Sequence, residues 1–348
     1  MDSLQKVAVS FHVGGIVMIG VVGTIANLLT IIAICKYKHL RIPGNFFLLN
    51  LALADLIVCT VTNPFTVVSL VNRDWPLSNS LCFFLGAALT LSCSASTTNL
   101  VSIAINRYMS ILWPQKSQDI FTVKRTLLFC LTGWLVSFIT IIPPFFGFGK
   151  FGYNDVILAC NISNDGNWLY TLVVLGTYFN ISTIIIIFCY TKIFMFIRRS
   201  RVRTQSDLGR SIQAAQRRVS REIRVAKNLL VVYVAYSICW GPILLLTAVD
   251  INQSAPPSIW RFASFLAVLN SSVNPFIYAW KNNKFRNAYK DLLRCGTKPS
   301  KPLDSSTFRE HSNSGNLTLG KTSSTLQSSK NSPKTSPSGS STLPRNVP

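Results

Sequence analysis

The sequence predicts an all-α membrane protein, in which a bundle of seven transmembrane helices is followed by a short amphipathic helix. Three observations predict this fold. Of the 348 residues, 49% are hydrophobic and only 13% are charged, whereas charged residues make up about 25% of soluble domains. Seven long apolar runs follow one another along the chain, and basic residues gather in alternate connections between them.

Each apolar run is long enough to cross a bilayer. A helix needs about 20 mostly apolar residues for this, and the Gly and Pro residues inside several runs are tolerated in membrane helices. The expected spans are residues 10–35, 44–70, 81–111, 122–146, 167–197, 223–249 and 259–280. We expect one membrane domain over residues 10–295, a short N-terminal segment at 1–9 and a separate tail at 296–348.

The basic residues predict the orientation of the chain, because cytoplasmic connections of membrane proteins carry an excess of Lys and Arg. Segments 36–41, 107–125, 192–227 and 281–294 hold 23 of the 34 Lys and Arg residues, and four lie in the intervening segments. The N-terminus should therefore be extracellular and the C-terminus cytoplasmic, in a multi-pass protein of the plasma membrane. The net charge of +22 then indicates contact with anionic membrane lipids, and no nucleic-acid partner is expected.

The segment after the seventh span is amphipathic. Over residues 282–294, apolar side chains share one helical face and basic side chains the other, which is typical of a short helix lying on a membrane surface. Cys295 follows it directly, where S-palmitoylation is expected. The tail is rich in Ser, Thr, Asn, Pro and Lys, cannot bury a core and should be disordered.

Two of the nine cysteines lie at the outer side of the membrane domain. Cys82 lies at the outer end of the third span, and Cys160 lies in the connection after the fourth. Both are predicted to be extracellular, where the environment is oxidising and disulfides persist. We therefore expect a disulfide between Cys82 and Cys160.

Asp55 is an ionisable residue in the middle of the second span. Such residues are costly inside a bilayer and are functional candidates by default. Its expected neighbours are Ser96, Asn270 and Asn274, together with Asn27, each near the middle of another span. One carboxylate among hydroxyl and amide oxygens suits a sodium ion, for which Asp55 would be the charged ligand. The alternative is a protonated Asp55 in a structural hydrogen-bond network. No other cofactor is expected.

Other polar and proline residues have plainer explanations when taken singly. Arg107 could be an interface arginine that reaches toward water. Pro242 and Pro275 should kink their helices, and the indole of Trp240 beside the first kink could mark a hinge or only packing.

Together these residues resemble the rhodopsin-like (class A) G-protein-coupled receptors. Three motifs carry the resemblance: Cys239-Trp240-Gly241-Pro242, Asn274-Pro275-x-x-Tyr278 and Asn106-Arg107-Tyr108. Six helices also each hold one signature residue, in order along residues 10–295. These residues are Asn27, Asp55, Arg107, Trp134, Pro242 and Pro275. The Asn-Arg-Tyr variant is similar to that of melatonin-like receptors and related orphan receptors.

The resemblance implies a receptor without enzymatic activity. A ligand would bind in the outer half of the bundle, and outward movement of the sixth helix would open the cytoplasmic face to a heterotrimeric G protein. Ser and Thr residues of the tail would be phosphorylated by receptor kinases, and the added charge would recruit arrestin. The implied switch residues are Asn106, Arg107, Tyr108, Tyr190, Glu222, Trp240, Pro242, Asn274, Pro275 and Tyr278.

The sequence departs from this family at two positions. Asn106 replaces the usual acid beside Arg107, although Glu222 could still pair with the arginine. We therefore expect raised basal signalling that Glu222 moderates and that Asn106→Asp lowers. Ser182 stands where the fifth helix commonly has proline, which places the usual helical bulge in doubt.

The expected ligand is neutral or lipid-like and small. The seventh span has no Lys in its outer part for a retinal Schiff base, and the outer third span has no acid for a cationic amine. The predicted pocket is apolar with a few hydroxyl groups, as small-molecule pockets often are. Its expected residues are Leu89, Thr90, Cys93, Val174, Trp240, Ile243, Leu244, Thr247, Trp260 and Ser264.

Two sequons lie in segments predicted to be extracellular. Asn161-Ile162-Ser163 is the first candidate for glycosylation, although the adjacent Cys160 could hinder glycan transfer, and Asn252-Gln253-Ser254 is the second.

Two other classes of membrane protein, transporters or channels and seven-helix enzymes, are the alternatives to a receptor. A transporter or channel should show paired charges or symmetric broken helices, and a seven-helix enzyme should show a metal-binding set of residues. Neither pattern is present in the sequence.

Overall fold

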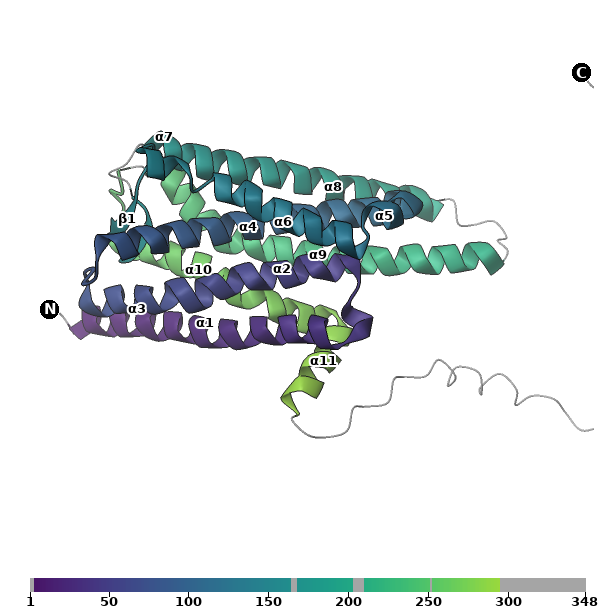
Figure 1. Ribbon diagram of the computed structural model, residues 1–348, viewed down its shortest axis with the longest axis horizontal. Coiled ribbons are helices and arrows are strands. Elements are labelled where there is room, and N and C mark those ends of the chain that lie inside the picture. The colour runs from purple at the N-terminus through teal and green to yellow at the C-terminus, as the bar shows by residue number, and fades with distance from the viewer. Residues whose placement is uncertain (1–2, 164–167, 203–209, 251, 295–348) are drawn as a thin grey trace, which may run out of the picture. The chain divides into compact units, whose positions relative to one another are not determined.

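The computed structural model describes residues 3–163, 168–202, 210–250 and 252–294 and confirms the seven-helix bundle (Figure 1). Seven helical stretches in these residues are long and apolar enough to cross a membrane. They run from Val9 to Lys36, Pro43 to Asn72, Asn79 to Leu112, Val123 to Phe146, Leu169 to Arg199, Glu222 to Val249 and Pro257 to Lys281. The structure thus reproduces each expected span to within a few residues, because hydropathy over 20 or more residues is a strong local signal.

Four of the spans are single helices. They are α1 (Ser3–Lys36), α4 (Asn79–Leu112), α9 (Arg210–Val249) and α10 (Pro257–Lys281). The second span consists of α2 (Pro43–Ile57), η2 (Val58–Thr62) and α3 (Asn63–Asn72). The fourth consists of α6 (Val123–Ile139) and η3 (Pro143–Phe146), and the fifth of α7 (Trp168–Thr171), η4 (Leu172–Thr177) and α8 (Tyr178–Val202).

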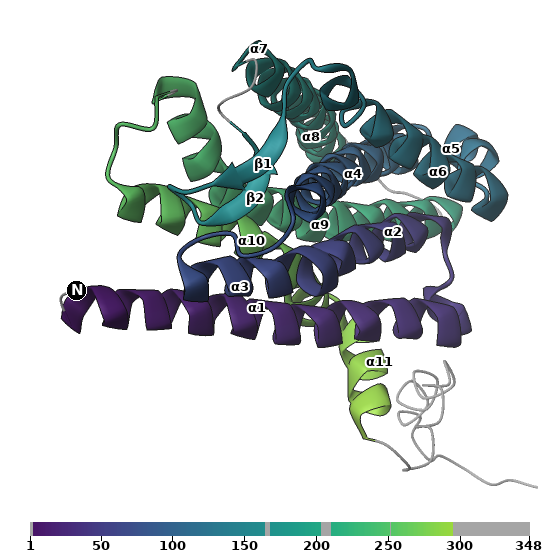
Figure 2. The same cartoon turned by 60° about the vertical axis from the view of Figure 1, so that its left-hand side comes forward.

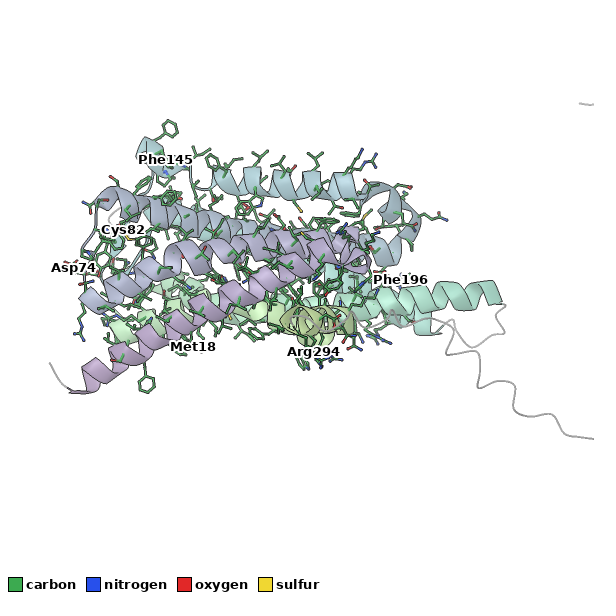
Figure 3. All side chains as sticks on the ribbon, turned by 60° about the horizontal axis from the view of Figure 1, so that its bottom comes forward. Met18, Asp74, Cys82, Phe145, Phe196 and Arg294 are labelled. Atoms are coloured by element: carbon green, nitrogen blue, oxygen red, sulfur yellow. A yellow bond between two sulfur atoms is a disulfide. The ribbon has the colours of Figure 1, made fainter. Side chains whose placement is uncertain are left out.

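Three short helices and a hairpin complete the described chain. The helices are η1 (Lys38–Leu40), α5 (Pro114–Ile120) and α11 (Asn283–Leu293), which is the amphipathic helix expected after the seventh span. Strands β1 (Phe151–Asn154) and β2 (Ala159–Ile162) form an antiparallel hairpin. Figure 1 shows this hairpin at one end of the bundle and α11 at the opposite end, which we call the hairpin end and the α11 end. Figure 3 places Asp74 and Cys82 near the first and Phe196 and Arg294 near the second.

Two of the spans widen into π-helical segments. In the second span η2 ends two residues before Pro64, which has no N–H and cannot continue the regular hydrogen-bond pattern. In the fifth span η4 ends before Tyr178, and Ser182 lies in regular helix within α8. The fifth helix therefore contains a bulge in the stretch before Ser182 although the proline is missing, so the doubt raised by Ser182 is not borne out.

Buried amide groups join three of the helices. Asn50 of α2 donates from Nδ2 to Asn99 Oδ1 of α4 at 2.8 Å, and its Oδ1 accepts from Trp134 Nε1 of α6 at 2.8 Å. Without water in the hydrocarbon core, polar groups must find partners inside the protein. These bonds therefore join α2 to both α4 and α6.

The hairpin is fastened to α4. Cys160 of β2 forms the expected disulfide with Cys82 of α4, with the two Cα atoms 5.3 Å apart. Close packing reinforces this attachment, because a Cβ atom at Gly86 would lie 3.0 Å from the backbone oxygen of Asn161 and 3.1 Å from Phe151 Cβ. Glycine at this position therefore lets the strands pack closely on the helix without displacement, and Figure 2 shows the strands beside α4.

Candidate functional site

A cavity opens between the hairpin and the bundle, at the hairpin end. Its volume is about 170 Å³, slightly more than an engineered cavity of about 150 Å³ that binds benzene in another protein. It can therefore hold at least one aromatic ring. The walls come from α4, the fifth span and α9, and α10 contributes Trp260.

Nine of the ten residues expected in the pocket line this cavity. They are Leu89, Thr90, Cys93, Val174, Trp240, Ile243, Leu244, Thr247 and Trp260. Ser264, the tenth, does not line it, so its assignment to the cavity wall is corrected. The cavity lies against α4, the fifth span and α9, and Ser264 is one turn beyond Trp260 along α10. Whether these nine residues contact a ligand stays a prediction.

Several lining residues were not anticipated from the sequence. Some lie deeper in the bundle or on the fifth span: Ser94, Thr97, Thr171, Leu172, Tyr178, Phe179 and Tyr236. Others lie in connections: Asn154, Ile157, Asn161, Ile162, Asp250 and Gln253. One signal could have found the residues of the hairpin. The expected disulfide ties Cys160 to the outer end of the third span, so its sequence neighbours must lie over the pocket.

The hairpin connection is bound to the segment between α9 and α10. Asn154 Nδ2 donates to Gln253 Oε1 at 3.2 Å, and Arg261 Nε donates to the backbone oxygen of Val156 at 2.9 Å. Ile157 and Trp260 pack in one apolar cluster beside these bonds. The hairpin therefore covers this side of the cavity and is joined to α10 as well as to α4.

Asp250 is the charged residue among those that line the cavity, and its carboxylate already has several partners. It accepts from the backbone and side chain of Ser254, from the backbone of Ala255 and from Trp260 Nε1. The hydrogen bond from the Ser254 hydroxyl and those from the backbone lower the pKa of Asp250 to about 2. The carboxylate thus shapes its own loop and orients the Trp260 indole.

The floor of the cavity is aromatic. The Tyr236 ring lies 6.2 Å from the Trp240 ring and stacks on Phe179 at 6.1 Å, measured between centroids. Its hydroxyl hydrogen bonds to Thr97 Oγ1 at 2.6 Å. Trp240, which was expected to line the pocket, therefore belongs to an aromatic layer with Tyr236 and Phe179. Through the bond to Thr97, this layer joins α4, α8 and α9.

Asp55 of α2 is buried, with 1% of its surface exposed. Asn274 Nδ2 donates to Asp55 Oδ2 at 2.8 Å, which joins the second and seventh spans. Ser96 and Asn270 are buried in the adjacent helices α4 and α10. Asn27 donates to the backbone oxygen of Ser271 at 2.8 Å. The structure thus pairs Asp55 and Asn274 directly and buries the other two expected members in the same interior.

The oxygen atoms of this interior fit a small hard cation. Asn274 Oδ1 and Asn27 Oδ1 are buried acceptors without a hydrogen-bond partner among the described residues. Buried polar atoms rarely stay unpaired. A carboxylate with spare amide oxygens nearby is the donor chemistry that sodium requires, so the residues are compatible with the expected ion.

At the α11 end, Arg107 joins α4 to α9. Its Nη1 donates to Glu222 Oε2 at 3.0 Å, with the two side chains 9% and 27% exposed. Asn106 Oδ1 accepts from Arg107 Nη2. The pair expected between Arg107 and Glu222 is therefore present, and Asn106 holds the same guanidinium through a neutral side chain. A Cβ atom at Gly44 of α2 would collide with the guanidinium, so glycine leaves room for it.

The remaining switch residues surround this pair or lie along the helices that carry it. Tyr108 and Tyr190 pack in one apolar cluster, and Tyr278 packs on Phe285 of α11 with centroids 5.8 Å apart. The Tyr278 hydroxyl is buried without a partner among the described residues. Pro242 and Pro275 lie inside α9 and α10. Cys295 and the tail lie outside the described residues.

Asn161, the first candidate for glycosylation, belongs to the residues that line the cavity. Its Oδ1 is buried, whereas the residue as a whole is half-buried. Glycosylation at Asn161 stays a prediction. Asn252, the second candidate, is exposed in the segment between α9 and α10.

Comparison with known proteins agrees with this arrangement. Residues 26–278 match the family of 7 transmembrane receptors (rhodopsin family). The chain is 32% identical to the melatonin receptor type 1C of Gallus gallus over 279 residues, which cover 78% of this chain and 79% of that one. It is 31% identical to the melatonin receptor type 1A of Mus musculus over 78% and 77% of the two chains.

A solved structure, that of squid rhodopsin, has the same fold. It superposes with a TM-score of 0.75 at 23% identity and covers 86% of this chain and 91% of the rhodopsin chain. The family match spans the signature residues from Asn27 to Tyr278. The chain therefore belongs to the rhodopsin family of seven-transmembrane receptors, the class A G-protein-coupled receptors, which signal without enzymatic activity, and within it the chain is similar to the melatonin receptors.

Proposed function

We propose that this receptor binds a small neutral ligand in the cavity at the hairpin end and activates a heterotrimeric G protein at the α11 end. The cavity carries this proposal, because its lining offers apolar and aromatic surface with few free polar groups. Pockets of this kind hold small molecules by burial and orient them with a few polar contacts. The hairpin end would face outward and the α11 end the cytoplasm, as the distribution of basic residues indicates.

The charges around the cavity favour a neutral ligand. Among the described residues that line it there is no Lys or Arg to pair with a carboxylate. The carboxylate of Asp250 is already bound to Ser254, Ala255 and Trp260, so a cationic amine would have to displace these partners. Burying an unpaired charge is costly. The relatives are named for melatonin, which is a neutral indole. An indole ring is compatible with the aromatic floor that Phe179, Tyr236 and Trp240 form.

Activation would proceed through movement of α9. Trp240 and Tyr236 connect the cavity to the middle of this helix, and Pro242, two residues after Trp240, removes a backbone hydrogen bond beside them. The Arg107–Glu222 ion pair holds the other end of α9 against α4. A ligand that favours the opened helix would shift the population toward a state that exposes the α11 end to the G protein.

Nucleotide exchange on purified G proteins, added to membranes that contain the receptor, tests this proposal. We expect melatonin or another neutral indole to accelerate exchange. Thr247→Phe, which fills part of the cavity, should abolish the response, and Leu245→Phe, at a side chain 63% exposed on the same helix, should retain it. If neutral indoles, lipids and fatty acids all leave exchange unchanged with every class of G protein, the proposal is wrong.

A sodium ion at Asp55 is a second part of the proposal. Asp55, Ser96, Asn270 and Asn274 would hold it and would favour the closed bundle. We expect sodium chloride to stabilise the purified receptor against heat more than choline chloride does at the same ionic strength. At a sodium concentration tenfold above Kd, the gain is about 1.4 kcal/mol. Asp55→Asn should remove this difference, and an equal difference in that variant would contradict a site at Asp55.

Partners of the C-terminal segment belong to the same proposal. Basic side chains of α11, among them Lys284 and Lys290, are exposed, and anionic lipid would attract them. The tail, which lies outside the described residues, would be the substrate of receptor kinases. Phosphate groups on its Ser and Thr residues would then bind arrestin through charge-assisted hydrogen bonds.

A further inference from the structure

Asn161 occupies an unusual place in the cavity wall. It lies in β2 directly after the disulfide-bonded Cys160 and pairs in register with Gly152 of β1. Its backbone oxygen packs closely against Gly86 of α4. The backbone of this residue is therefore held by the neighbouring disulfide, by the strand pairing and by α4, and the residue belongs to the cavity wall.

The Asn161 carboxamide differs from the other polar groups around it. Its Oδ1 is buried and has no hydrogen-bond partner among the described residues. By contrast, the nearby Asn154 carboxamide is bound at both ends. The Thr97 hydroxyl is bound to Tyr236, and the Asp250 carboxylate is bound to Trp260. A buried acceptor without a donor costs free energy until a partner arrives.

A molecule in the cavity could supply that partner. The terminal χ2 torsion of asparagine turns over a broad range at little cost, so the carboxamide can rotate toward the cavity while its backbone stays in place. The apolar and aromatic walls would hold the body of the ligand by burial. The carboxamide would then distinguish ligands by their hydrogen-bonding group, because a polar site rejects an analogue that leaves it unpaired.

We propose that Asn161 is a specificity-determining residue of this receptor, whose carboxamide oxygen accepts a hydrogen bond from an N–H or O–H group of a neutral, mainly apolar ligand. The inference rests on the proposed function of the cavity. It also implies that the sequon at Asn161 stays unmodified, because the same carboxamide cannot carry a glycan and face the ligand.

Two small probes separate the hydrogen bond from apolar burial. Indole has an N–H donor, and 1-methylindole lacks it. Binding to the purified full-length receptor is measured by thermal stabilisation over a range of probe concentrations. We expect indole to bind the wild-type receptor roughly 3- to 10-fold more tightly than 1-methylindole, the range that one net hydrogen bond provides.

Three variants complete the test. Asn161→Leu keeps the volume of the side chain but removes the acceptor, so the ratio between the probes should fall to about 1. Asn161→Asp keeps an acceptor and should preserve a preference for indole. Ser163→Ala removes the sequon but leaves the carboxamide, so the ratio between the probes should stay as in the wild type; because Ser163 is buried, the stabilisation by each probe is measured relative to the same variant without a probe.

The outcomes that overturn the inference are distinct from those that overturn the proposed function. An unchanged probe ratio in Asn161→Leu, with both probes still bound, contradicts the role of Asn161 and leaves the cavity as the ligand site. Binding of neither probe to the wild type contradicts the inference, whereas the proposed function fails only if lipids and fatty acids also leave nucleotide exchange unchanged. Glycosidase treatment gives an independent readout: a mobility shift of the wild type that Ser163→Ala abolishes would show a glycan on Asn161 and overturn the inference.

Discussion

Glu222→Gln is expected to raise nucleotide exchange in the absence of ligand at least fivefold. The substitution removes the charge that pairs with Arg107 at 3.0 Å and keeps the size of the side chain. Arg107 is 9% exposed, so little water can replace the lost carboxylate, and the closed bundle loses stability relative to the opened one. Coupling energies of about 1–3 kcal/mol correspond to shifts of about 5- to 150-fold.

A matched control removes a negative charge from the same end of the bundle. Asp119 is exposed in α5, and Asp119→Asn should leave exchange without ligand close to the wild-type rate. Asn106→Asp should act in the opposite direction to Glu222→Gln, because a carboxylate would then lie beside the guanidinium that Asn106 already contacts. Equal basal rates in Glu222→Gln and the wild type would show that this ion pair does not restrain α9.

Replacement of either disulfide cysteine by alanine is expected to destabilise the receptor and to abolish ligand binding at physiological temperature. The bond joins residues separated by 78 positions and fastens the hairpin over the cavity. Loss of a native disulfide costs about 2–5 kcal/mol in small domains. Here we expect the hairpin in particular to lose stability, and its residues form one wall of the cavity.

Thermal unfolding and probe binding measure the two effects separately. Cys82→Ala, Cys160→Ala and the double variant should lose similar stability, because each removes the same bond. Cys35→Ser is the control, since Cys35 is a free and exposed cysteine. Full probe binding by the double variant, with an unchanged melting temperature, would contradict a structural role for the disulfide.

The seven spans and the motifs were accessible from the sequence because both are local signals. A run of 20 apolar residues predicts a membrane helix wherever it occurs. The pairs Cys82–Cys160 and Arg107–Glu222 were also anticipated. Each joins two groups that the expected topology places at the same end of the bundle, and each has few alternative partners there.

The bulge in the fifth span was less accessible. The missing proline at Ser182 cast doubt on the bulge, because a proline disturbs the helix in the turn before it. The structure nevertheless has a π-helical segment at Leu172–Thr177. Its location depends on packing against neighbouring helices, and a substitution at one position carries no information about that packing.

The sequence by itself determined that this protein crosses a membrane seven times, that its family is that of the rhodopsin-like receptors, and that Asp55 and Arg107 are its principal interior polar residues. Only the tertiary structure decided which residues enclose the cavity. Ser264 lies outside it, and Asn161, expected to carry a glycan, lies in its wall. The physical reason is that hydropathy and motifs are properties of one helix, whereas a cavity is bounded by residues from several helices and from a hairpin. The position of that hairpin depends on a disulfide between two cysteines that lie 78 residues apart in the sequence.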